Sequence, residues 1–150
     1  MIIELIQDIK YLKLIQIITK EAYGYLPWSE QNYFDDWNLD YTCYYGLWIG
    51  SELVGFVHYS YFVDDYEILN VAILSDYQNK GYGQYLITQT LKKVQAQTCL
   101  LEVRASNVSA QKVYQKVGFQ VIQCRKNYYS NPVEDAIIMK WSDDDESVEK

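Results

Sequence analysis

The sequence is poor in residues that bind metals or act as nucleophiles. It has a single histidine, His58, and three widely spaced cysteines, Cys43, Cys99 and Cys124. One histidine is too few for a zinc site or a Ser-His-Asp triad, and the cysteines form neither a metal-binding pair nor a disulfide framework. We therefore expect reduced thiols in a cytoplasmic protein that binds no metal, with His58 in a structural role.

Long apolar runs and an excess of positive charge are also lacking. No stretch reaches membrane-spanning length, and the N-terminus has neither the basic region nor the cleavage site of a secretory signal, so we expect no membrane partner. The net charge of −7 argues against direct DNA or RNA binding and is compatible with a cationic substrate. Much of the acidic excess lies in residues 142–150, which we expect to form a solvated, disordered tail.

The rest of the chain has the size and the pattern of one α/β domain, residues 1–141. Apolar patterns predict strands at about 2–6, 42–49, 53–62, 66–74, 98–104, 119–127 and 134–141. They predict helices at about 8–22, from Ser29, from near Gly81 and over 107–117. This order, with hairpins first and strand–helix–strand units later, predicts a mixed sheet with helices packed on it.

The most informative motif lies where the apolar strand at 66–74 meets an amphipathic helix. Its sequence is Gln78-Asn79-Lys80-Gly81-Tyr82-Gly83. The two glycines keep bulky side chains away from the first helical turn, so free N–H groups and the helix dipole can attract a phosphate. The spacing lacks the Lys-Ser/Thr pair of a nucleoside-triphosphate loop and the third glycine of a dinucleotide-binding motif. The motif therefore favours a pyrophosphate site, with a plain tight turn as the alternative.

A second group of polar residues lies at and after the strand that ends near Arg104. Glu102 interrupts the apolar run of this strand, and a surface charge paired with Arg104 or a neighbour is the simpler interpretation. Asn107 has the chemistry of an N-cap for the next helix. Tyr114 lies on the apolar face of that helix, so it is a core aromatic unless its hydroxyl points into a cleft.

Together these motifs resemble the GNAT acetyltransferase superfamily and, within it, the bacterial RimI group of ribosomal-protein-alanine N-acetyltransferases. The matching stretches are residues 27–30, 70–73, 77–83, 101–107, 113–119, 125–129 and 134–139, nearly the whole chain apart from the acidic tail. The hexad and the region around Gly118 mark the superfamily, whereas 102–107 and 127–129 are more specific. The chain departs from the family at Asn79, where an arginine is usual, and at 73–76, which lack the usual aspartate-proline turn.

The resemblance implies a GNAT fold, a mostly antiparallel mixed sheet of about seven strands flanked by about four helices, with splayed middle strands that hold acetyl-CoA. It implies direct acetyl transfer, with Glu102 as the general base and Tyr114 as the acid that protonates the leaving thiolate. The residues that it implies for acetyl-CoA binding are Val71, Ala72, Ile73, Gln78, Asn79, Lys80, Gly81, Tyr82, Gly83, Gln84, Asn107 and Tyr114.

The implied acceptor is the N-terminal α-amine of a protein, the alanine of small-subunit ribosomal protein eighteen. Acidic residues in predicted loops and strand ends would attract the arginines that follow this alanine. They are Asp35, Asp36, Asp40, Asp64, Asp65, Glu67, Glu134 and Asp135. Two alternatives stay open: an acetyltransferase for a polyamine, an aminoglycoside or a lysine side chain, and a CoA-binding module without catalysis.

Overall fold

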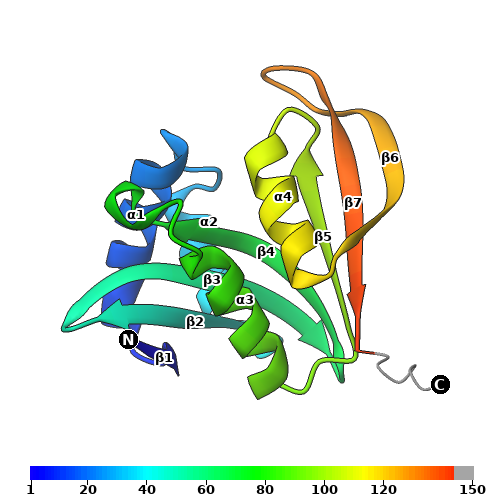
Figure 1. The fold of residues 1–150 in the computed structure, drawn as a ribbon. Helices are drawn as coiled ribbons and strands as arrows, with labels where there is room; N and C mark the ends of the chain where they lie inside the picture. The colour runs from blue at the N-terminus through cyan, green and yellow to red at the C-terminus, as the bar shows by residue number, and fades with distance from the viewer. Residues whose placement is uncertain (144–150) are drawn as a thin grey trace.

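The computed structural model describes residues 1–143 and places them in a seven-stranded sheet flanked by four helices (Figure 1). The strands are β1 (Ile2–Leu5), β2 (Thr42–Ile49), β3 (Glu52–Phe62), β4 (Asp65–Ile73), β5 (Thr98–Arg104), β6 (Gln120–Tyr129) and β7 (Glu134–Ser142). The helices are α1 (Leu12–Tyr23), α2 (Glu30–Trp37), α3 (Tyr82–Lys93) and α4 (Val108–Val117). Each predicted element is present, although the helix expected at 8–22 begins as a separate 3₁₀ turn, Ile9–Tyr11.

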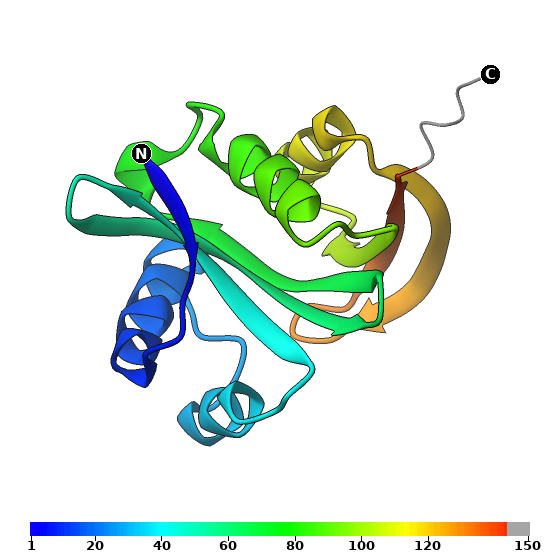
Figure 2. The same ribbon diagram turned by 90° about the horizontal axis from the view of Figure 1, so that it is seen from below.

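The sheet has the order β1-β2-β3-β4-β5-β7-β6, with helices on both faces. Helices α3 and α4 lie on one side, and α1 and α2 lie on the other (Figure 2). Neighbouring residues of a strand point to opposite faces, so Val57 of β3 packs beneath α3 with Leu86, whereas Phe56 packs beneath α1 with Ile15. The mixed α/β fold predicted from the sequence is therefore confirmed.

The sheet opens between β4 and β5. These strands run parallel, but they pair only from Asp65 to Glu67 on β4 and from Thr98 to Leu100 on β5. The register of β4 against β3 shifts at Leu69, which has no partner of its own, and a bulge of this kind bends a strand. Beyond this bulge β4 pairs with β3 alone, and β5, β7 and β6 run at a steep angle to β4 (Figure 1). The splayed strands implied by the resemblance are present.

The C-terminal boundary of the sheet differs slightly from the prediction. Strand β7 continues to Ser142, which pairs with Thr98, and the N–H of Asp143 donates to the carbonyl of Gln97 (2.8 Å). Two residues assigned to the acidic tail therefore belong next to the sheet, and the rest of that tail, 144–150, lies outside the described residues. Within residues 1–143, no helix is both long and apolar enough to cross a membrane.

His58 has the structural surroundings expected for it. It is 1% exposed on β3, and its Nε2 lies 2.6 Å from the Oδ2 of Asp36 on α2. Its ring stacks on Tyr44 at 3.9 Å and meets the edge of Trp28 at 5.6 Å. Asp36 was expected in a loop or at a strand end, where it could attract the acceptor, and this was wrong, because α2 contains it, turns its side chain toward β3 and buries it.

Candidate active site

A cleft of about 420 Å³ opens where β4 and β5 part. Three of the predicted site residues line it together: Glu102 from β5, Asn107 from the start of α4, and Tyr114 from within α4. Its opposite side is formed by the end of α1 and the segment after it, including Tyr23 and Trp28. The fold thus brings two chemically distinct groups, a carboxylate and a phenol, to one cavity.

Glu102 faces the cleft because successive side chains of β5 point to opposite faces of the sheet. Leu101 and Val103 on either side are buried in the core, so the side chain between them points to the other face of the sheet. Its carboxylate lies 3.7 Å from the guanidinium of Arg125 on β6. The sequence suggested Arg104 or a neighbour as the partner, and Arg104 is not that partner, since it is bound to Glu134.

The Glu102 carboxylate has two further polar neighbours. Its hydrogen bond with the hydroxyl of Tyr128 is the largest cause of a raised pKa at that tyrosine. Glu67, on the same face of β4, has a raised pKa because of partial burial and then because of the negative charge of Glu102. The two carboxylates and the Arg125 cation leave one negative charge in excess at this point, which favours a cationic ligand.

Tyr114 is both a core residue and a cleft residue. Its ring packs against Phe119 at 5.9 Å, and its other side lines the cavity. Burial raises the pKa of its hydroxyl well above the ordinary value of 10, with smaller contributions from Tyr23 and Tyr129. The hydroxyl therefore keeps its proton at neutral pH and can donate it.

The N-terminus of α3 presents a row of free donors. Among the described residues, the backbone N–H groups of 79–84 have no acceptor. Asn79 at φ +63° and Gly81 at φ +85° turn the chain so that these groups follow one another around the helix end. A Cβ at Gly83 would make ordinary contacts with Ile73 and Val113 at 3.9 Å, whereas one at Gly81 would meet no protein atom within 4 Å, so the space beside Gly81 is open. This arrangement fits a pyrophosphate.

Two predicted cofactor residues serve the loop and the core instead of facing this space. The side-chain amide of Gln78 donates to the carbonyl of Ile73 (2.8 Å), and its backbone N–H donates to Ser75 (3.2 Å). Ala72 is 3% exposed and pairs with Phe56 on β3. Gln78 therefore fixes the path of the loop from β4 to α3.

Strand β4 turns the backbone groups of alternate residues toward the gap. The N–H of Leu74 bonds to the carbonyl of Val54 on β3, so the alternation of an antiparallel pair turns the backbone groups of Val71 and Ile73 away from β3. The carbonyl of Ile73 accepts the amide described above, and the hydroxyl of Tyr23 donates to the carbonyl of Val71 (2.6 Å). The edge of the gap is left with two N–H donors.

Sequence patterns did not reveal the aromatic residues that line the cleft beside Tyr114. They are Tyr23, Tyr25, Trp28 and Tyr129, and only the last two lie in stretches that match the family. The Tyr23 hydroxyl also lies 2.6 Å from the side chain of Asn70, 47 residues away in the chain. A contact of this length in sequence has no local pattern, so the folded structure alone reveals it.

Comparisons with known proteins agree with this geometry. Residues 11–119 match the model of the Acetyltransferase (GNAT) family. A [ribosomal protein bS18]-alanine N-acetyltransferase of Haemophilus ducreyi is 33% identical over 148 residues, 91% of this chain and 97% of that protein. The crystal structure of the ribosomal-protein-S18-alanine N-acetyltransferase from Escherichia coli superposes with a TM-score of 0.83 at 29% identity, covering 94% and 92% of the two chains.

An Arabidopsis thaliana protein solved in complex with acetyl-CoA shares the fold at a TM-score of 0.80 and 15% identity, covering 94% of this chain and 98% of its own. The row of donors at the start of α3, the open edge of β4 and the family match over 11–119 lead to one conclusion. The chain belongs to the GNAT family and is an acetyl-CoA-dependent acetyltransferase.

Proposed function

We propose that the protein transfers the acetyl group of acetyl-CoA to the N-terminal α-amine of a protein, the alanine of ribosomal protein bS18, in the cytoplasm. The observation that carries the proposal is the meeting of Glu102 and Tyr114, from different elements, in the cleft beside the open edge of β4. The names of relatives at 32–39% identity support the choice of acceptor.

Acetyl-CoA, when bound, supplies the acetyl group as a thioester. The N–H groups of residues 79–84 hold its pyrophosphate. A backbone N–H of Val71 or Ile73 polarises the thioester carbonyl, because these donors point into the gap without a strand partner. A donor placed in this way stabilises the oxyanion by roughly 3–4 kcal/mol.

Glu102 and Tyr114 carry the proton transfers of the reaction. Glu102 takes a proton from the incoming ammonium, either directly or through a water molecule. An α-amine, with a pKa of about 8, needs less help than a lysine at about 10.4. Tyr114 donates its proton to the departing thiolate, a role that suits a phenol held protonated by burial. The nitrogen loses a second proton as the amide forms, and this proton restores the Tyr114 phenol, while Glu102 returns its proton to solvent and the thiolate leaves as the free thiol of CoA.

Four of the acidic residues expected to attract the acceptor fall into two groups. Asp36 lies against His58, Glu134 pairs with Arg104, and Asp135 pairs with Lys126, so these three carboxylates already have partners within the protein. Glu67 instead lies beside the Glu102 carboxylate on the open face of the sheet. The local excess of negative charge favours an acceptor that carries an arginine after its N-terminal alanine.

The test is acetyl-CoA turnover with two short peptides that begin Ala-Arg, one with a free N-terminus and one blocked, analysed by mass spectrometry. We expect acetylation of the free α-amine only. In further reactions, spermidine or a peptide with one lysine and a blocked N-terminus is added as a competing acceptor. A preference for either of these would replace the proposed acceptor with a small amine or a side chain, and binding of acetyl-CoA without any turnover would indicate a silent module.

A further inference from the structure

We propose that Arg104 and Glu134 are positioning residues for the acceptor, which hold the β6–β7 connection as one wall of the cleft. The inference rests on the proposed function and adds to it the residues that set the shape of the acceptor site. Arg104 and Glu134 are given no contact with acetyl-CoA, whose backbone donors for the pyrophosphate and the thioester carbonyl are expected on α3 and β4.

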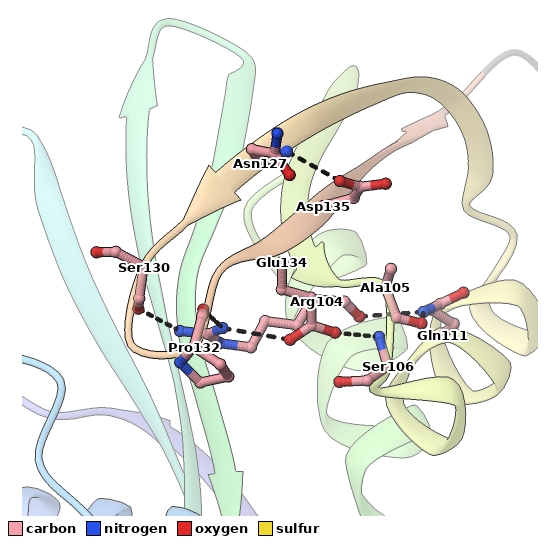
Figure 3. Close-up of polar contacts among 9 residues, drawn as sticks. All are labelled: Arg104, Ala105, Ser106, Gln111, Asn127, Ser130, Pro132, Glu134 and Asp135. Carbon is pink, nitrogen blue, oxygen red and sulfur yellow. Dashed lines mark hydrogen bonds and ion pairs between the residues drawn. The ribbon is translucent and has the colours of Figure 1, made fainter.

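Arg104 lies beneath the β6–β7 connection and binds its backbone (Figure 3). Its Nη1 donates to the carbonyl of Pro132 (3.2 Å) and to Glu134 (3.2 Å), and its Nη2 donates to the carbonyl of Ser130 (3.4 Å). The guanidinium also lies over the ring of Tyr129 at 4.3 Å, and Tyr129 lines the cleft. One side chain from β5 therefore fixes both the turn and the aromatic residue before it.

Glu134 joins this contact to the start of α4. One of its oxygens accepts from Arg104, and the other accepts the backbone N–H of Ser106 at 2.5 Å. Ser106 is next to Asn107, the N-cap of α4, and α4 carries Tyr114. The carboxylate thus ties the wall of the cleft to the element that bears the proposed acid (Figure 3).

Two further contacts hold the same junction. The side-chain amide of Gln111 on α4 donates to the carbonyls of Arg104 (3.2 Å) and Ala105 (3.0 Å). The N–H of Ala105 donates to the backbone carbonyl of Asp135 (3.0 Å). Three elements, β5, α4 and β7, therefore meet in one hydrogen-bonded unit, and the connection that follows β6 is attached to it through Arg104.

The hairpin contains a bulge that directs side chains at Glu102. Between Arg125 and Tyr129 the register of β6 against β7 shifts, and the N–H of Asn127, at φ +51°, donates to the carboxylate of Asp135 (2.9 Å). This bulge brings the side chains of Arg125 and Tyr128 next to the carboxylate of Glu102, the proposed base. A displaced hairpin would therefore change both the wall of the cleft and the surroundings of Glu102.

The decisive variant is Arg104→Lys, which keeps the positive charge but lacks the planar fork that reaches three acceptors. We expect the KM for the Ala-Arg peptide to rise by about tenfold while the affinity for acetyl-CoA stays within about twofold. Glu134→Gln is a second variant, and its amide can still accept one of the two bonds, so a smaller rise in KM is expected. Lys126→Gln, an 83% exposed cation on the same hairpin, is the matched control and should behave as the wild type.

Hydrogen exchange of residues 128–134 supplies a readout that is independent of turnover. We expect these amides to exchange faster in Arg104→Lys than in the wild type and in Lys126→Gln. Unchanged exchange, an unchanged peptide KM, or a parallel loss of acetyl-CoA affinity would each overturn the inference. If the wild type acetylates no peptide, the proposed acceptor is wrong, and the KM comparison moves to the amine that the wild type does accept.

Discussion

The two walls of the cleft are held by different forces. On the side of α1 and α2, Trp28 packs against Tyr33 and His58, and His58 forms its buried pair with Asp36. On the side of β5–β7, the wall depends on Arg104 and Glu134, whose side chains are 27% and 17% exposed. The first wall is held by aromatic packing over the buried Asp36–His58 pair, and the second by hydrogen bonds between charged groups that are partly exposed to solvent.

The difference predicts how each wall responds to its surroundings. The Arg104–Glu134 pair is partly exposed, so salt should weaken it more than the buried Asp36–His58 pair, which is costly to break. The residues proposed for proton transfer, Glu102 and Tyr114, belong to the second wall. The proposed chemistry therefore depends on the wall that salt disturbs more, and the proposed acceptor site is shared with the wall that salt disturbs less.

The largest expected difference between the two walls comes from a change at Glu102. We expect Glu102→Gln to lower kcat by about 10³-fold, because the amide cannot take the proton of the ammonium. Binding of acetyl-CoA, measured by calorimetry, should stay as in the wild type. Glu67→Gln, on the same face one strand away, is the matched control, and an equal loss there would mean that negative charge alone supports the reaction.

The wall of α1 and α2 is tested by Asp36→Ala. This change leaves His58 buried without its partner, and we expect the free energy of unfolding to fall by about 3 kcal/mol in urea titrations. Its neighbour Asp35 is exposed on the same helix, so Asp35→Ala should cost less than about 0.5 kcal/mol. Equal losses in the two variants would show that the buried pair adds nothing specific.

A change at Tyr114 tests whether the second wall carries the chemistry. Tyr114→Phe should reduce kcat by about 10²-fold with little effect on folding, since only the hydroxyl is lost. The pKa of Tyr114 is raised above 10 by burial, so this group stays protonated as the pH rises to that value. An alkaline fall in activity below pH 10 that disappears in Tyr114→Phe would contradict the raised pKa.

Tyr23 connects the first wall to the backbone of β4. Tyr23→Phe removes the bond to the carbonyl of Val71, and we expect about a threefold loss in kcat/KM. The neighbouring Tyr25→Phe serves as the control, because both residues line the cleft but Tyr23 alone is bonded to β4. Equal effects of the two changes would assign Tyr23 to packing alone.

The smallest effect concerns the pH dependence of the charged wall. Hydrogen bonds from Ser106, and then Arg104, hold the pKa of Glu134 below its ordinary value of 4.5. A pKa lowered by folding stabilises the folded form above the ordinary value, and that contribution is lost as the pH falls through the lower value. Amides 128–134 should therefore lose protection on acidification below 4.5, and Glu134→Gln should lack this step.

The positions of strands and helices were predictable because they depend on local patterns. The apolar run at 66–74 and the glycines at 81 and 83 sufficed to place β4 and α3. The splay of β4 from β5 was not derivable from residues, and it came from the family resemblance. The partner of Glu102 stayed open between Arg104 and a neighbour because charge pairing depends on strand register, and the register of β5 against β7 sets Arg104 opposite Ala136 and within reach of Glu134.

Because β4 pairs with β5 over only a short stretch, a small tilt at that stretch moves the far end of β4 by a larger distance. Only three residue pairs join the two strands, and β4 continues past them for six residues, from 68 to 73, or roughly 20 Å. A tilt of about 5° at the paired end therefore displaces the far end of β4 by nearly 2 Å, on the order of half a residue's rise along a strand. The distance between the two sides of the cleft is thus set where the strands pair, at residues 65–67 and 98–100.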